Sequence, residues 1–176
     1  MSISESLFGI TLENLTYHTL ENYFIEEKEE SDRLEFKSFH AGPSFRDQFK
    51  SIKEGLTGFL NSDGGILIWG APVETPIPGT TRKRCIGHLT PMNEAKDKDD
   101  FVRSVNSSIT PFPVGIKLNK ITGHNGYILV FEIERSRYSP HQFDNTYFAR
   151  IDGQTIKAPH YLIESLFRKI TYPNLG

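Results

Sequence analysis

Two glutamates near the N-terminus have the residue type and spacing of ligands for a metal ion. Glu30 and Glu35 lie five residues apart, and Lys37 follows the second of them. Magnesium and manganese prefer oxygen ligands, and two or three carboxylates with water molecules complete such a shell. A cation held there would activate water or stabilise a leaving oxygen, while Lys37 would hold a phosphate as a point charge. The alternative is a solvated strand edge with a Glu–Lys pair.

The chain must bend if both glutamates are to reach one ion. Apolar residues alternate with Glu35 and Lys37, which predicts a half-buried strand over residues 33–38 with Glu35 on its polar side. Five extended residues would separate the two glutamates by about 16 Å. The polar run over residues 30–33 permits the bend that a shared ion requires.

Basic side chains provide candidate contacts for a polyanion at three places. The first is a stripe along a predicted helix, with spacings of four and three residues, formed by Arg46, Lys50 and Lys53. The second is a cluster in the long loop, formed by Arg82, Lys83 and Arg84. Both groups are suited to phosphate contacts. The alternative is that their side chains are solvated and bind nothing, which the same sequence pattern would also produce. The third is Arg150 in a predicted strand, which would contact nucleic acid or pair with a buried carboxylate.

The overall charge does not point to nucleic acid, but its distribution is uneven. The formal net charge is −2. Residues 1–44 hold nine acids and three bases, whereas residues 45–176 hold 13 acids and 17 bases. A polyanion could therefore bind a basic face formed by the later part of the chain, while the acidic segment supplies metal ligands. The alternative is that this uneven distribution of charge arose by chance and has no function.

The composition is that of a globular protein, with 37% hydrophobic and 24% charged residues. A single cysteine, Cys85, excludes an internal disulfide and a cysteine-based zinc cluster within the chain. No apolar run approaches the roughly 18 residues of a membrane span, and the first residues do not read as a secretory signal. We therefore expect a cytoplasmic protein with no membrane contact.

Interleaved helical and strand patterns predict an α+β fold, a mixed β-sheet with flanking helices. Helices are expected over residues 12–27, 44–61 and 94–108 and from Pro159 onward, the last with Leu162, Leu166, Phe167 and Ile170 inside. Strands are expected over residues 33–38, 66–69, 114–122, 127–135 and 146–151, and residues 71–84 form one long loop. We expect a helical segment over 1–27, the main domain over 28–158 and a C-terminal helix over 159–176.

Three stretches in this order resemble the Schlafen AlbA-like domain family, which is described as DNA-binding. They are LEFKSF at 34–39, GFLNSDGGILIWG at 58–70 and YFARI at 147–151. In the family the second usually reads like "AFANTxGGxLxxGVDD" and the third like "YYxRxG", and the turn from Asn61 to Gly65 is the most specific match. The resemblance covers roughly residues 28–158. It implies a mixed α/β domain that binds nucleic acid.

The resemblance also implies an alternative function, because some relatives are metal-dependent endoribonucleases that act on structured RNA such as tRNA. Those relatives carry two glutamates five residues apart and an aspartate in the GVDD segment. Glu30 and Glu35 match the pair, but the GVDD segment reads GAPV at 70–73, with Glu74 one residue later. Glu74 or Asp63 would then have to complete the metal shell.

A binding module, an endoribonuclease and an interaction subunit are the function classes that remain. Nucleotide hydrolysis is disfavoured, because G-x-x-x-x-G-K-[ST] is absent and Gly64-Gly65 has no following lysine to reach phosphates. The expected cofactor is magnesium or manganese, with no nucleoside triphosphate. The choice between RNA and DNA stays open, as does assembly into a homo-oligomer or with a partner subunit that completes the active site.

Overall fold

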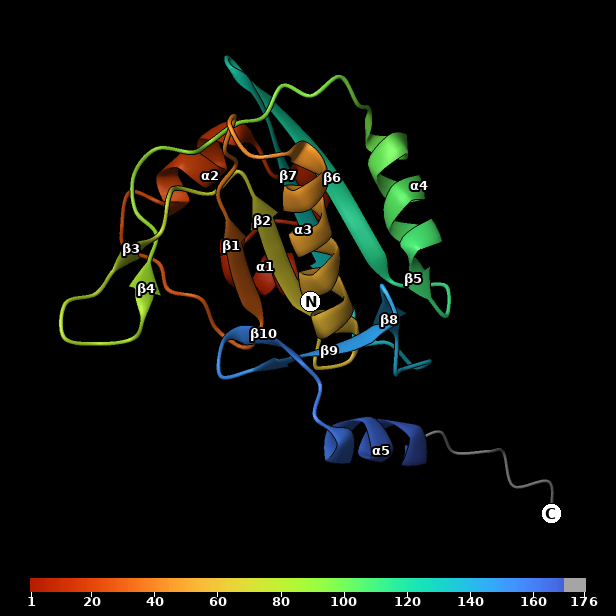
Figure 1. Ribbon diagram of the computed structural model, residues 1–176. Coiled ribbons are helices and arrows are strands. Elements are labelled where there is room, and N and C mark those ends of the chain that lie inside the picture. Colours follow the sequence, from red (N-terminus) through yellow and green to blue (C-terminus); the bar gives the residue numbers. More distant parts are fainter. Residues whose placement is uncertain (170–176) are drawn as a thin grey trace.

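The computed structural model of the chain describes residues 1–169 and is built on a four-stranded sheet (Figure 1). The strand order is β1-β2-β7-β6, formed by Leu34–Lys37, Gly65–Trp69, Gly126–Ile133 and Ile116–Gly123. β1 and β2 are parallel, and the other two pairings are antiparallel. The mixed sheet and its flanking helices confirm the expected α+β fold.

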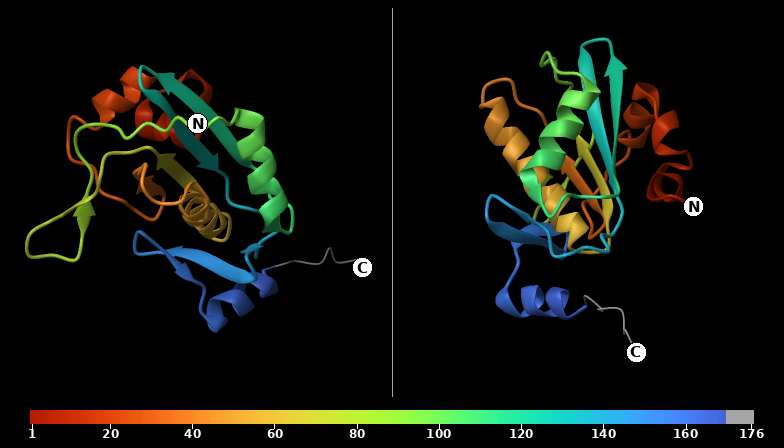
Figure 2. Two further views of the ribbon diagram at one scale, coloured as in Figure 1. Left: turned by 45° about the horizontal axis from the view of Figure 1, so that its top comes forward. Right: turned by 90° about the vertical axis from the view of Figure 1, so that its right-hand side faces the viewer.

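The strands of this sheet alternate between two apolar cores. On β2, Leu67 and Trp69 pack beneath α3 (Phe45–Leu60) and α4 (Lys98–Ser108), whereas Ile66 and Ile68 face the N-terminal helices. Figure 2 shows α3 and α4 on one face of the sheet and the N-terminal helices on the other. β1 follows the same rule, so Leu34 and Phe36 point to the N-terminal side and leave Glu35 on the α3 side.

The N-terminal helical segment differs from the single helix expected over residues 12–27. It consists of α1 (Ile3–Phe8), the short 3-10 helix η1 (Leu12–Asn14) and α2 (Tyr17–Tyr23). Ser2 and Glu5 form a capping box that starts α1, and the Thr16 side chain accepts from the backbone N–H of Thr19 to start α2. Capping groups rather than apolar periodicity therefore set these boundaries.

A tight turn joins α3 to β2 and explains the most specific part of the sequence pattern. Gly64 has φ +74, and a side chain there would collide with the carbonyl oxygen of Ile133. Asn61 ends α3 as its C-cap and points its side chain into the protein. The turn thus places the end of α3 and the start of β2 directly against β7.

A second, smaller sheet lies against the C-terminal half of α3, in the order β10-β9-β8-β5 (Figure 1). Its strands are Gln154–Lys157, Thr146–Ile151, Gln142–Phe143 and Ile109–Thr110. α5 (His160–Arg168) follows, with Leu166 buried but Phe167 49% exposed, so the placement of Phe167 inside the helix packing was wrong. The prediction for Ile170 lies outside the described residues.

The predicted long loop contains a two-stranded arm that extends from the body of the protein (Figure 1). β3 (Thr75–Pro76) pairs antiparallel with β4 (Lys83–Arg84), and we call residues 75–84 the arm. Cys85 and Lys28 exchange backbone hydrogen bonds at the base of the arm. Among the described residues, no helix is long and apolar enough to cross a membrane.

Candidate functional site

A tight turn before β1 brings Glu30 back beside Glu35. Ser31 donates from its backbone N–H to the Leu34 carbonyl at 3.0 Å, and Leu34 donates to the Ser31 carbonyl at 3.3 Å. The chain therefore doubles back on itself, and Glu30 Oε1 accepts a hydrogen bond from the Phe36 backbone N–H at 2.8 Å. This is the bend that the two glutamates needed.

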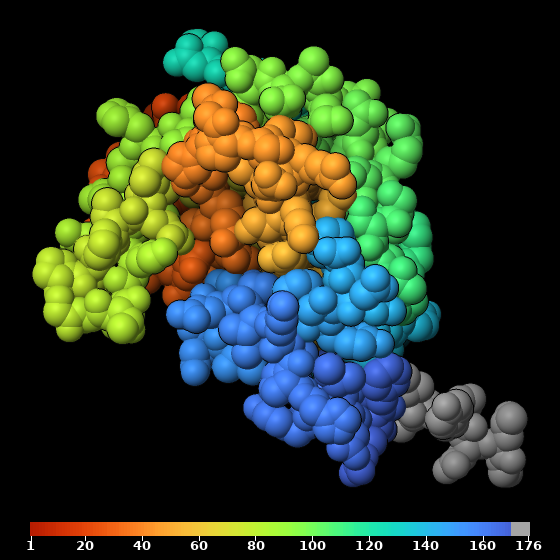
Figure 3. All heavy atoms as spheres, viewed as in Figure 1, coloured from red at the N-terminus to blue at the C-terminus, as the bar shows by residue number. Residues whose placement is uncertain are grey.

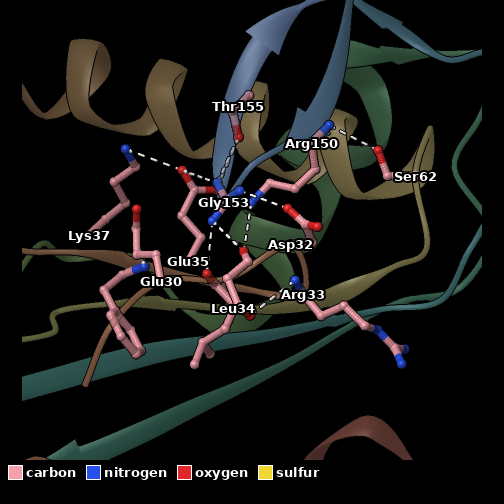
Figure 4. A network of polar contacts seen from close by, with 12 residues as sticks. Glu30, Asp32, Arg33, Leu34, Glu35, Lys37, Ser62, Arg150, Gly153 and Thr155 are labelled. Carbon is pink, nitrogen blue, oxygen red and sulfur yellow. Dashed lines mark hydrogen bonds and ion pairs between the residues drawn. The ribbon is translucent and has the colours of Figure 1, made fainter. Parts of the chain in front are cut away.

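Glu35 is enclosed by three partners on the α3 side of β1. Its side chain is 3% exposed, and Oε1 lies 3.3 Å from Lys37 Nζ and 3.4 Å from Arg150 Nη1. Thr155 Oγ1 donates to Oε2 at 3.4 Å. Figure 4 shows Lys37, Arg150 and Thr155 converging on this carboxylate, with Glu30 next to it. Glu35 is therefore a buried, charge-compensated carboxylate, and the solvated strand edge does not describe it.

Arg150, on β9, holds Glu35 and the turn before β1 in place. Its side chain has no exposed surface, and Nη2 donates to the carbonyl oxygens of Leu34 at 2.8 Å and Ser31 at 3.0 Å. Its Cζ lies 5.1 Å from the centroid of the Phe59 ring. Of the two roles expected for Arg150, pairing with a buried carboxylate is observed. Its assignment to nucleic-acid contacts is corrected, because the side chain borders the cavity with no exposed surface and its donors are engaged by Glu35 and by backbone carbonyl oxygens.

Gly55 is a signal that the sequence reasoning missed. It lies in α3 directly opposite Glu35, and a β-carbon at this position would collide with Glu35 Oε2 and press on Leu67. A glycine in a helix interior costs roughly 1 kcal/mol relative to alanine, so its presence needs a reason. The reason here is space for the carboxylate between the strand and the helix.

Burial and neighbouring acids change the acidity of Glu30. Desolvation, chiefly, and then the charges of Glu35 and Glu74 raise its pKa from 4.5 to about 7, against the opposing effects of the Phe36 hydrogen bond and of Arg150. A carboxyl that holds its proton near neutral pH can exchange protons or cations under ordinary conditions.

Stability should therefore fall as the pH rises through the range in which Glu30 titrates. The unfolded chain releases this proton near pH 4.5 and the folded chain only near pH 7, so each step upward between these values favours unfolding. We expect Glu30→Gln, which keeps an acceptor for the Phe36 N–H, to be more stable than the wild type by about 2 kcal/mol at pH 8. Urea unfolding at pH 4.5 and pH 8 measures this, and an equal difference at both values would contradict it.

An open cavity of about 610 Å³ surrounds these residues. Figure 3 shows the hollow between the arm, α3 and the hairpin of β9 and β10. Its lining acids are Glu29, Glu30, Glu35, Glu54, Glu74 and Asp152, and its lining bases are Lys37, Arg82, Lys83 and Arg150. Glu30, Glu35, Lys37 and Glu74, the predicted catalytic residues, therefore all line one cavity. Asp63 is elsewhere, paired with Arg135 at 3.5 Å.

The carboxylates do not form a ready three-ligand metal centre. Among residues 1–169, no three His, Cys, Asp or Glu side chains are close enough together to hold an ion. Glu35 is engaged by Lys37 and Arg150, and Glu74 Oε2 lies 3.3 Å from Lys83 Nζ. Magnesium is commonly held by one or two carboxylates and water molecules, so an ion bound by Glu30 and Glu35 would have to compete with Lys37 and Arg150 for the Glu35 carboxylate.

The three bases of the arm are each paired with an acid, two of which come from the segment before β1 and the third from the residue before the arm. The pairs are Arg82 with Glu29, Lys83 with Glu74 and Arg84 with Glu27. Arg82 and Lys83 nevertheless remain 69% and 63% exposed. Such exposed pairs contribute only about 0–1 kcal/mol each. Arg82 and Lys83 are therefore accessible at the mouth of the cavity, whereas Arg84 does not line it.

The helical stripe lies on the flank of α3 away from the cavity. Lys50 Nζ is 3.1 Å from Asp144 Oδ2, and Lys53 Nζ lies 4.4 Å from the centroid of the Phe49 ring. Burial lowers the pKa of Lys53. Arg46, in the first turn of α3, is exposed. The stripe exists as expected, but internal contacts occupy two of its three members.

Comparison with a family model covers most of the chain. The model described as "Schlafen, AlbA_2" matches residues 30–159, which include the turn before β1, every cavity-lining residue except Glu29, and the whole main sheet. None of the curated proteins matches the chain.

Two solved structures resemble the fold at low sequence identity. The crystal structure of the DIP2311 protein from Corynebacterium diphtheriae aligns with a TM-score of 0.48 and 14% identity, over 89% of this chain and 26% of that one. The solution NMR structure of the N-terminal domain of an ATP-dependent DNA helicase RecG-related protein from Nitrosomonas europaea aligns with a TM-score of 0.51 and 17% identity, over 84% and 97%. The second likeness shows a shared fold.

Proposed function

The chain belongs to the Schlafen, AlbA_2 family, and from this membership and the geometry of the cavity we propose that it binds nucleic acid. The contact face is the one that carries the cavity and the arm. Family membership is the basis for the class of ligand, nucleic acid. The charges and the exposure of the side chains are the basis for the location of the contact face.

The observation that carries this proposal is the group of accessible bases at the cavity mouth. Lys37, Arg82 and Lys83 all line the cavity, and their side chains are partly or largely exposed. Arg82 and Lys83 are held by weak, exposed ion pairs with Glu29 and Glu74, in which the phosphates of a polyanion can replace the carboxylates. Lys37 pairs with the buried Glu35 and keeps that partner. The acids deeper in the cavity repel phosphates, so the backbone of the nucleic acid would follow the rim.

Removing the arm bases should weaken binding and its dependence on salt. For Arg82→Ala/Lys83→Ala we expect roughly tenfold weaker binding at low salt and a logarithmic salt slope smaller by about 2, since each lost phosphate contact reduces the slope by about 1. Fluorescence anisotropy with labelled RNA and DNA oligonucleotides at several salt concentrations measures both quantities. The matched control is Lys98→Ala/Arg103→Ala on α4. Equal losses in the two double variants would show that only net charge matters.

We propose metal-dependent cleavage of structured RNA, such as tRNA, as a second candidate function. Its support is the turn that places Glu30 beside Glu35, together with Glu74 in the same cavity. A magnesium or manganese ion held by Glu30 and Glu35 would supply activation of water or stabilisation of the leaving oxygen. A third oxygen ligand would come from Glu74 after separation from Lys83, or from a partner subunit in a composite complex.

Incubation of pooled tRNA with the chain, with and without manganese, tests the second function. Cleavage that requires manganese and is lost in Glu30→Gln, but kept in the exposed-surface variant Glu13→Gln, is the expected result. Binding without cleavage under the same conditions would reject this function for the chain alone. Cleavage that continues in Glu30→Gln would reject the assigned residues.

A further inference from the structure

A second cavity adjoins the first and lies between α3 and the loop after β1. It has a volume of about 360 Å³, within the range of about 300–1,000 Å³ typical of small-ligand pockets. Lys37, Ser51, Glu74 and Lys83 line both cavities. Because the two share these walls, they form one trough with a junction at Lys37 and Lys83. We call the second cavity the groove.

One wall of the groove is held in place by the protein itself. Gln48 Nε2 on α3 donates to the His40 carbonyl at 2.7 Å, and Gln48 Oε1 accepts from the His40 backbone N–H at 3.0 Å. Ser38 Oγ and His40 Nε2 lie 2.9 Å apart. The loop after β1 is thus fastened to α3 before any ligand arrives, which lowers the entropy cost of binding.

The charged side chains of the groove are gathered at its junction with the first cavity. Apart from the imidazole of His40, its charged or titratable lining residues are Lys37, Glu74 and Lys83, and these are all shared. The remaining lining is apolar or neutral, and Val73 contributes a side chain that is 51% exposed. Such a groove suits a flat, neutral, partly apolar group that is attached to an anion at one end.

We propose that the groove binds an unpaired nucleobase whose phosphate lies at the junction between Lys37 and Lys83. This inference rests on the proposed nucleic-acid binding and names the form of the ligand, a single-stranded segment. His40 is exposed at the rim, where an imidazole can stack on a base. A continuous duplex keeps its bases stacked and paired, so it has no group to place in the groove.

A comparison of ordinary and abasic oligonucleotides tests the inference. The probes are a fluorescent single-stranded RNA and an abasic ribose-phosphate oligomer of the same length and charge. We expect the wild type to bind the base-containing probe about tenfold more tightly. Equal affinity for both probes would reject base binding in the groove but would leave the proposal of nucleic-acid binding intact. Binding of neither probe at low salt would reject the proposed function, and the groove with it.

Two matched pairs of variants locate the base. His40→Ala and Val73→Glu should bring the affinity ratio of the two probes close to one. Their controls are His124→Ala at the tip of the β6–β7 hairpin and Val114→Glu, which make the same changes at exposed positions outside the groove. The controls should keep the tenfold preference. A preference that survives in both groove variants would overturn the assignment.

Discussion

Arg150→Met is expected to lower the free energy of unfolding by about 3–5 kcal/mol, because it breaks a buried ion pair by removing one partner. The Glu35 carboxylate would stay buried at 3% exposure, with Lys37 as its remaining cationic partner. The carbonyl oxygens of Ser31 and Leu34 would lose the donors of the guanidinium, which loosens the turn that positions Glu30.

Urea unfolding of the variant measures this effect, with Arg137→Met as a matched control at an exposed position. The control should change stability by less than about 0.5 kcal/mol. The double variant Arg150→Met/Glu35→Gln should recover part of the loss, because the remaining side chain is then neutral. Equal stability of Arg150→Met and Arg137→Met would contradict the role given to the buried pair.

Asn61→Ala is expected to cost about 3–5 kcal/mol, the second large effect, because it leaves buried backbone groups without partners. Asn61 Nδ2 donates to the carbonyl oxygens of His141 and Phe148, both at 2.8 Å, and Oδ1 accepts from the His141 N–H at 2.6 Å. One side chain thereby links the end of α3 to β9 and to the segment before β8. Loss of these bonds should separate the small sheet from α3.

The control for this residue is Asn22→Ala, which changes an exposed asparagine whose side chain hydrogen-bonds to His18 at 3.0 Å. We expect a small change in the control and, for Asn61→Asp, a loss at least as large as for Asn61→Ala, because a second carboxylate oxygen would then face the carbonyl oxygens of His141 and Phe148. Thermal unfolding monitored by circular dichroism ranks the three variants. A loss below about 1 kcal/mol for Asn61→Ala would show that water satisfies the freed groups.

Elements with strong periodicity could be predicted from the sequence. α3 has apolar residues at helical spacing along its whole length and was predicted to within one residue at each end, and the β6–β7 hairpin was predicted from its turn. Short elements were missed, among them α1, β10 and the strands of the arm. Segments of two to six residues show no clear period. Pairing with neighbouring strands determines the conformation of β10 and of the arm, and a capping box starts α1.

The sequence predicted those features of the candidate site that are local in the chain, but not those that depend on the fold. Spacing identified Glu30 and Glu35, and the family pattern identified Arg150, because these features are local in the sequence. The pairing of the arm with Glu27, Glu29 and Glu74 depends on the fold and could not be read from the chain. Two of these pairs, Arg82 with Glu29 and Arg84 with Glu27, join the acidic first part of the sequence to the basic later part and so partly neutralise the uneven charge.

Chemical-shift mapping by NMR with a single-stranded RNA oligonucleotide tests the central claim most directly, because it locates the contact face without any substitution. We predict shifts of backbone amide signals in residues 35–40, 73–84 and 152–155, around the cavity, the groove and the arm. Shifts confined to α1, α2 and α4, or none at low salt, would contradict the claim that this face binds nucleic acid.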